Sequence, residues 1–143
     1  MGTGDAGVLA GKRCVVMGIQ NRWSIAYAIA EQMAQAGGQL ALTYVDERAG
    51  RDALKLAEQY GGRGYICNVE SDEDLDRLAA DLGRDLGQVD VVVHSIGFAP
   101  AGELAGRFID TSRDGFRVAM SVSCYSLVAS AQRLAPLMTA SPA

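Results

Sequence analysis

The chain has 143 residues, which is enough for one compact α/β domain and too few for two independent ones. A composition of 49% hydrophobic and 21% charged residues is that of a globule with a packed core, and it excludes a disordered or fibrous chain. Lysine and arginine number 13 against 17 aspartate and glutamate, so the formal net charge is −4. These charges are interspersed without a basic block, so we expect no binding to nucleic acid.

The cysteines and the N-terminal segment indicate a reducing compartment. Cys14, Cys67 and Cys124 are odd in number and lie in apolar stretches, as small buried hydrophobic residues do. Residues 1–10 carry no secretion signal, and no apolar run is long enough to span a membrane. We therefore expect a cytoplasmic protein with no membrane partner. No group of His, Cys and carboxylate residues has the spacing of metal ligands, so no metal is expected.

Apolar runs of strand length alternate four times with segments of helical period, which predicts a parallel sheet built from strand–helix units. We expect strands over residues 13–18, 39–44, 64–68 and 89–95. We expect helices over residues 24–36 and 49–60, from Ser71 onward, and over 112–138. Ser71 and Asp74 form a capping-box pattern at the start of the third helix. Serines in the last segment weaken its pattern, so it can also be read as two helices.

The apolar spacing also predicts which side chains face the core. In the first helix these are Ile25, Ile29 and Met33. In the third helix they are Leu75, Leu78, Leu82 and Leu86. In the last segment they are Phe116, Ala119, Val122, Leu127, Ala131 and Leu134.

Right-handed crossovers between four consecutive units place the strands in the order 3-2-1-4. The expected fold class is therefore α/β, a Rossmann-like doubly wound parallel sheet that stops before a fifth strand. The order reverses between the first and fourth strands, so a ligand is expected in the crevice after Gly18 and after Val93.

The turn after the first strand has features of a phosphate-binding site. Gly18 permits a tight turn and a close approach of a pyrophosphate, and free backbone N–H groups near Ser24 and Ile25 can bind it. The turn is not GxGxxG, and the short-chain dehydrogenase spacing would need glycines where the chain has Arg22 and Ser24. On spacing alone, a purely structural turn is an equally good interpretation.

Three segments carry a resemblance to a known family: GIQNRWSIAYAIA at 18–30, LALTY at 40–44 and HSIGFAP at 94–100. They resemble bacterial enoyl-acyl-carrier-protein reductase, a divergent member of the short-chain dehydrogenase/reductase superfamily, over nearly the whole chain. The resemblance implies NADH-dependent reduction of the trans-2 double bond of enoyl thioesters on acyl-carrier protein, in type II fatty acid biosynthesis. It also implies a homotetramer, with the long C-terminal helices at the interface.

The resemblance also implies roles for individual residues in a dinucleotide-binding domain over 1–143. Pyrophosphate and ribose would lie against Gly18, Ser24 and Ile25. Asn68 and Val69 would bracket the adenine. The remaining positions are Ser95, Ile96 and Gly97 toward the nicotinamide ribose, Val122 behind the cofactor, and Ala99 on the substrate side.

The residues after the second strand bear on the choice of cofactor. Val45 and Asp46 would lie at the adenosine ribose, and the carboxylates of Asp46 and Glu47 would accept its hydroxyls and repel a 2′-phosphate. NADH is therefore the expected cofactor, while Arg48 and Arg51 leave NADPH open.

The expected site contains no catalytic residue. His94, the only histidine, is expected to be structural, and Tyr125 to belong to the core or an interface. The family's tyrosine and lysine are expected past Ala143, so the domain would be incomplete at its C-terminus and inactive alone. Two alternatives stay open: a non-catalytic nucleotide-binding fragment, and another short-chain reductase that acts on a carbonyl.

Overall fold

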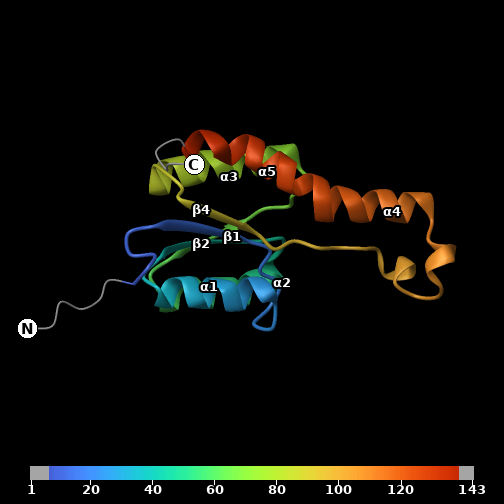
Figure 1. Ribbon diagram of the computed structural model, residues 1–143, viewed down its shortest axis with the longest axis horizontal. Helices are drawn as coiled ribbons and strands as arrows, with labels where there is room; N and C mark the ends of the chain where they lie inside the picture. The colour runs from blue at the N-terminus through green and yellow to red at the C-terminus, as the bar shows by residue number, and fades with distance from the viewer. Residues whose placement is uncertain (1–6, 139–143) are drawn as a thin grey trace, which may run out of the picture.

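The computed structural model describes residues 7–138, and these form a four-stranded parallel sheet (Figure 1). The strands are β1 (Arg13–Met17), β2 (Gln39–Tyr44), β3 (Arg63–Ile66) and β4 (Val91–His94). Their order across the sheet is β3-β2-β1-β4, which confirms the order predicted from right-handed crossovers.

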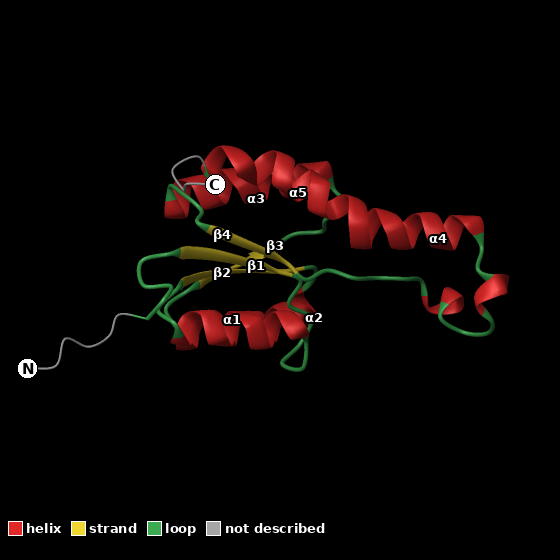
Figure 2. Ribbon diagram, viewed as in Figure 1, coloured by secondary structure: helices red, strands yellow, loops and turns green. Residues whose placement is uncertain are grey.

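Helices cover both faces of this sheet (Figure 2). On one face lie α1 (Ile25–Gln35) and α2 (Glu47–Gln59), and on the other lie α3 (Asp72–Leu86) and α5 (Ser126–Leu134). The remaining helix, α4 (Arg113–Met120), continues the line of α5 beyond the end of the sheet and is separated from it by a π-helical turn, Ser121–Tyr125. Short 3-10 turns occupy Ala101–Glu103, Phe108–Asp110 and Ala135–Leu137.

The core has one apolar layer on each face of the sheet. Successive residues of β1 point to opposite faces, so Cys14 and Val16 pack toward α1 and α2 while Val15 and Met17 pack toward α3 and α5. All four are fully buried, as expected of a strand covered on both faces. The helices bury Ala26 and Ala30 on α1, Ala53, Leu56 and Ala57 on α2, Leu75, Leu78 and Leu82 on α3, and Ala129 and Leu134 on α5.

The buried face predicted for α1 is wrong at its first residue. Ile25 is 75% exposed, Ile29 and Met33 are half-buried, and the fully buried positions are Ala26 and Ala30. The small alanine side chains allow the helix to approach the sheet closely. Ile25 lies about 100° around the helix from Ala26, so its side chain points away from the sheet.

The last helical segment is divided into two helices, α4 and α5, as the alternative reading of its sequence allowed, and the single apolar stripe predicted across it is partly wrong. Val122 and Leu134 are buried as expected, but Phe116, Leu127 and Ala131 are exposed. The π-helical turn carries more residues per turn than an α-helix and so shifts the phase of Leu127 and Ala131, which follow it. Phe116 precedes the turn and lies on α4, beyond the end of the sheet. The positions that face inward are Gly115, Val122, Ser126, Ala129, Ser130 and Leu134.

The capping box at the start of α3 is only half formed. The Ser71 Oγ accepts a hydrogen bond of 3.1 Å from the Asp74 backbone N–H, as expected of an N-cap. The Asp74 carboxylate, however, accepts from the backbone N–H of Asn68 at 2.8 Å instead of that of Ser71. The loop after β3 is thereby held against the first turn of α3.

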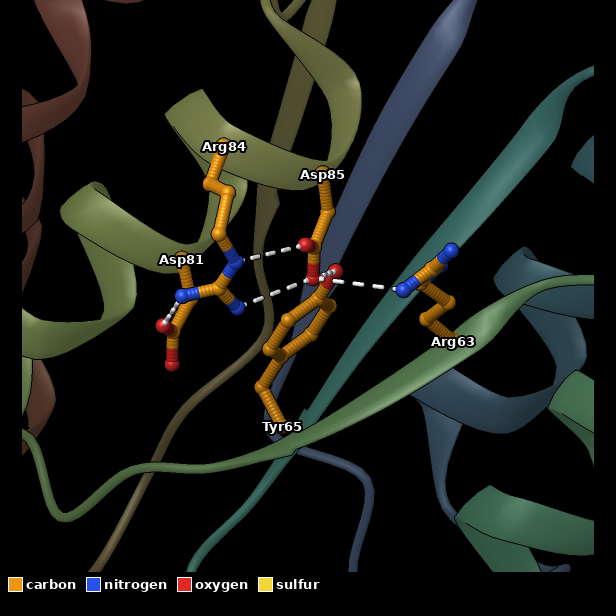
Figure 3. Close-up of polar contacts among 5 residues, drawn as sticks. All are labelled: Arg63, Tyr65, Asp81, Arg84 and Asp85. Atoms are coloured by element: carbon orange, nitrogen blue, oxygen red, sulfur yellow. Dashed lines mark hydrogen bonds and ion pairs between the residues drawn. The ribbon is translucent and has the colours of Figure 1, made fainter.

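The edge strand β3 is held to α3 by a polar cluster (Figure 3). The Tyr65 hydroxyl donates to Asp85 Oδ2 at 3.0 Å, and Arg63 lies 3.5 Å from the same oxygen. Arg84 bridges Asp81 and Asp85 along the helix at 2.7 Å and 3.0 Å. Burial first, and then the hydrogen bond to Asp85, raise the pKa of Tyr65 to about 12.

Within residues 7–138, no helix is long and apolar enough to cross a bilayer.

Candidate functional site

The carboxyl ends of the strands surround a cavity of about 560 Å³. Its walls come from the segments that follow β1, β2, β3 and β4 and from the π-helical turn. Open parallel sheets bind ligands in such a place, outside the carboxyl ends of the strands and at the point where the strand order reverses.

Gly18 allows the ends of β1 and β4 to meet beside this cavity. Its φ is +97°, and a Cβ at this position would overlap the carbonyl oxygen of Ser95. The backbone N–H of Gly18 donates to Thr43 Oγ1 at 3.4 Å, and that of Ile19 donates to the Thr43 carbonyl at 3.0 Å. Glycine is therefore required here both by the backbone conformation and by the close packing of two chain segments.

The N-terminus of α1 presents open hydrogen-bond donors. The Ser24 Oγ donates to the Asn21 carbonyl at 2.7 Å, so Ser24 does not cap the helix with its side chain. Among the described residues, the backbone N–H groups of Ile25 and Ala26 have no acceptor. Unpaired N–H groups at the positive end of a helix bind anions such as a phosphate.

The loops after β2 and β3 form the opposite end of the cavity. Asp46 accepts a hydrogen bond of 2.8 Å from the Ala49 N–H and so caps α2, which begins at Glu47 instead of residue 49. The Asn68 side-chain oxygen accepts from the Glu70 N–H at 3.1 Å. Hydrogen bonding to the Asn68 backbone holds the pKa of Asp74 below its usual value, so this carboxylate stays charged and keeps the loop in place.

Cys67 lines the cavity as a neutral thiol. Its side chain is buried, and burial, reinforced by the nearby charge of Asp74, raises the pKa of the thiol to about 11. A thiol with such a pKa is protonated at neutral pH and is a poor nucleophile. Cys67 therefore contributes shape and not covalent chemistry.

The π-helical turn supplies the third wall. Ser123 Oγ accepts from the Phe98 N–H at 3.0 Å and lies 3.1 Å from the Phe98 carbonyl, so it holds the loop after β4. Ser126 Oγ donates to the Val122 carbonyl at 2.6 Å and lies 2.7 Å from His94 Nε2. π-helical turns inside α-helices often occur at functional sites, and this one brings Val122 to the cavity.

Ten of the residues predicted from the sequence line this cavity: Gly18, Ser24, Val45, Asp46, Asn68, Val69, Ser95, Ile96, Gly97 and Val122. Ile25 and Ala99 do not, since the Ile25 side chain is exposed and Ala99 lies past the end of the wall formed by 95–98. Sequence reasoning missed Gln20, Thr43, Tyr44, Cys67, Glu70 and Phe98. Thr43, Tyr44 and Cys67 could have been found from their places at the carboxyl ends of predicted strands.

Across the part of the chain that the structure describes, no three His, Cys, Asp or Glu side chains gather so that they could hold a metal ion.

Comparison with known proteins gives a consistent result. The family model described as enoyl-(acyl carrier protein) reductase matches residues 18–143. The chain is 42% identical over 133 residues to the enoyl-acyl-carrier-protein reductase (NADH) of Aquifex aeolicus, covering 92% of this chain and 49% of that protein.

Solved structures agree with the sequence comparison. The enoyl-acyl-carrier-protein reductase of Anaplasma phagocytophilum, in complex with NAD, superimposes with a TM-score of 0.87 at 36% identity, covering 94% of this chain and 52% of the other. The Bacillus cereus enzyme, with NADP⁺ and indole naphthyridinone, superimposes with a TM-score of 0.88 at 38% identity, covering 93% and 53%.

The chain spans about half the length of the curated relatives it matches. Both the family model and relatives at about 40% identity match over most of its residues. The chain belongs to the enoyl-acyl-carrier-protein reductase family.

Proposed function

We propose that this chain forms the dinucleotide-binding part of an NADH-dependent enoyl-acyl-carrier-protein reductase of type II fatty acid biosynthesis. The proposal is supported by one observation: Gly18, the open N-terminus of α1 and the π-helical turn all border the same cavity. Together they offer a close approach to backbone, unpaired N–H donors and an apolar wall, which are the features that a nicotinamide dinucleotide needs.

The residues present fit such a cofactor along the length of the cavity. The pyrophosphate would lie against Gly18 and the open N–H groups of Ile25 and Ala26. The adenosine would lie between the loops after β2 and β3, with Asp46 at the ribose. The nicotinamide ribose would lie along residues 95–97, with Val122 behind it. A cavity of about 560 Å³ is in the range of small-molecule sites.

The proposed chemistry is divided between the cofactor and the protein. The dinucleotide, when bound, supplies the hydride that saturates the double bond. The residues of this chain bind and orient it. The thiol of Cys67, which lines the cavity, has a raised pKa and is protonated at neutral pH.

The substrate and the assembly are also part of the proposal. The substrate is an enoyl thioester on acyl-carrier protein, and the location is the cytoplasm. Exposed apolar side chains on α4, the π-helical turn and α5 support a homo-oligomer, a tetramer by resemblance, in which they are covered. They are Phe116, Met120, Tyr125, Leu127 and Val128.

The test is calorimetric titration of the folded chain with NADH, compared with a Gly97→Val variant. A Cβ at Gly97 meets nothing within 4 Å, so the variant should fold normally and should only fill the cavity. We expect the affinity for NADH to fall by about tenfold or more, the equivalent of about 1.4 kcal/mol. Gly102→Val is the matched control, since its Cβ would also meet open space and Gly102 lies outside the cavity.

Absence of heat with folded wild-type chain, or full NADH binding by Gly97→Val, would contradict the proposal. A second readout concerns activity. The chain spans about half the length of its relatives, so we expect residues 1–143 alone to bind NADH and to leave its nicotinamide absorbance unchanged when an enoyl thioester is added.

A further inference from the structure

The cavity wall that follows β4 is held by a single side chain. Residues 95–98 line the cavity, and the chain runs through them away from the end of the sheet (Figure 1). The Ser95 N–H donates to the Met17 carbonyl at 3.1 Å, which is the last hydrogen bond from this segment to the sheet. Among residues 7–138, every hydrogen bond made by residues 96–99 goes to the Ser123 side chain. The conformation of this stretch therefore depends on Ser123.

Ser123 holds Phe98 through both polar groups of its backbone. Ser123 Oγ accepts from the Phe98 N–H at 3.0 Å and donates to the Phe98 carbonyl at 3.1 Å. Paired hydrogen bonds to one residue fix its direction as well as its position, as in a hydrogen-bonded pair of antiparallel strands. These two bonds, here called the Ser123 clamp, keep the exposed Phe98 side chain at the wall of the cavity.

The π-helical turn allows Ser123 to take this position. Neighbouring residues of a helix point in different directions, so Val122 lines the cavity while Ser123 faces the loop. Ser126, at the end of the same turn, is bonded to His94 at the end of β4. The turn is therefore attached at both ends of the segment that forms the cavity wall.

The far part of the loop is attached separately, at the N-terminus of α4. The Glu103 carboxylate accepts from the Ser112 hydroxyl at 2.6 Å and from the Ser112 N–H at 2.9 Å. A Cβ on Gly115 would overlap the Glu103 side chain, so the glycine makes room for this carboxylate. The attachment involves none of residues 96–99. Removal of the Ser123 hydroxyl should therefore release only the part of the loop that lies at the cavity.

We propose that Ser123 is a positioning residue for the nicotinamide half of the cofactor, because it keeps residues 96–98 in the conformation to which that half binds. The inference rests on the proposed function, which places the nicotinamide ribose along residues 95–97. With the clamp formed, the free protein has already ordered this segment. Without the clamp, the segment must be ordered on binding, and the loss of conformational entropy opposes binding of the nicotinamide half alone.

The experiment compares NADH with adenosine 5′-diphosphate, which lacks the nicotinamide and its ribose, by calorimetric titration of the folded chain. In Ser123→Ala, we expect NADH affinity to fall by about tenfold and affinity for adenosine 5′-diphosphate to change by about twofold or less. Alanine is a better helix former than serine, so the variant should fold, and circular dichroism verifies this.

A conservative variant and a spectroscopic signal test the role of the hydroxyl. Ser123→Thr keeps the hydroxyl and should bind NADH within about threefold of the wild type. The fluorescence of bound NADH reports on the nicotinamide ring, and at saturation it should be weaker in Ser123→Ala than in the wild type or in Ser123→Thr. If folded Ser123→Thr loses as much NADH affinity as Ser123→Ala, the hydroxyl is not the cause and the inference is overturned.

Two control variants separate positioning from a general loosening. Ser121 lies on the same π-helical turn and outside the cavity, and its hydroxyl makes no hydrogen bond within the described part of the chain, so Ser121→Ala should bind both ligands as the wild type does. Glu103→Ala should speed tryptic cleavage at Arg107, in the far part of the loop, without changing either affinity. A loss of NADH affinity in either control equal to that in Ser123→Ala would overturn the inference.

The two ligands also separate failure of this inference from failure of the proposed function. Unchanged NADH affinity in folded Ser123→Ala, or an equal fall for NADH and adenosine 5′-diphosphate, would refute the positioning role alone. If the folded wild-type chain binds neither ligand, the proposed function itself is refuted.

Discussion

His94 Nε2 and Ser126 Oγ lie 2.7 Å apart and join the end of β4 to the start of α5. The single hydroxyl hydrogen of Ser126 is directed to the Val122 carbonyl at 2.6 Å, so the hydrogen between His94 and Ser126 comes from Nε2. Burial lowers the pKa of His94, which is consistent with this neutral tautomer. His94 thus links the end of β4 to the π-helical turn that carries Val122.

The depressed pKa of His94 predicts that stability falls on mild acidification. The unfolded state takes up a proton as pH falls through the ordinary pKa of 6.5, and the folded state does so only at lower pH. Stability is therefore full well above pH 6.5 and falls as the pH drops through 6.5 toward the lower pKa of the folded state. The measurement is the urea concentration at the midpoint of unfolding as a function of pH, at and below pH 6.5. In His94→Gln, this midpoint should depend less on pH. An equally steep slope in the variant would count against His94 as the cause.

Gly18→Ala should destabilise the fold by about 2 kcal/mol or more, through a positive φ and an overlap with Ser95. The matched control is Gly61→Ala, because Gly61 also has a positive φ, +67°, but its Cβ would meet nothing within 4 Å. That variant should lose only the conformational part, about 1 kcal/mol. Urea unfolding measures both, and equal losses would show that the contact with Ser95 is unimportant.

Tyr65→Phe should lower the free energy of unfolding by about 1 kcal/mol, because Asp85 loses the hydroxyl that donates to it. Tyr125→Phe serves as the comparison, since the Tyr125 side chain is exposed and its hydroxyl makes no hydrogen bond among residues 7–138. It should change stability by less than about 0.5 kcal/mol. The prediction fails if the two variants unfold at the same urea concentration.

The raised pKa of Tyr65 adds a dependence on high pH. The folded value is about 12 and the unfolded value is 10.0, so the contribution is present below pH 10 and is lost as pH rises through the folded value. The tyrosinate absorbance of the folded chain should show one group titrating late, and this late step should disappear in Tyr65→Phe.

The three cysteines should differ in their reaction with a thiol reagent. Cys124 is exposed, whereas Cys14 and Cys67 are buried and have raised pKa values, so one thiol per chain should react in the folded state. Cys124→Ser should abolish the reaction of this one thiol, and denaturant should expose Cys14 and Cys67 to the reagent. A rapid reaction of two or more thiols would show that one face of the sheet opens readily.

The sequence was sufficient to predict the strand order and the turn at Gly18, where local backbone chemistry and fold topology agree. Gly18 and the strand order follow from the turn pattern and from the handedness of crossovers, which do not depend on details of packing. Asn68 and Gly97, which the family resemblance placed along the cofactor, line the same cavity as Gly18 because the carboxyl ends of parallel strands meet at one edge of the sheet.

Periodicity failed where the backbone itself departs from regularity. The exposure of Leu127 and the burial of Ser126 depend on the π-helical turn, and a pattern based on a constant residue-per-turn count cannot register it. Ile25 was misplaced because apolar spacing does not reveal how closely Ala26 lets the helix approach the sheet.

The Ser126 N–H donates to the Ser121 carbonyl, five residues back in the chain. This one wide turn separates α4, which lies beyond the sheet, from α5, which packs against it. Deletion of Cys124 would convert the π-helical turn to regular α-helix and would leave α4 and α5 in their present orientations. The change would then alter the placement of Val122 at the cavity and leave the packing of α5 against the sheet in place.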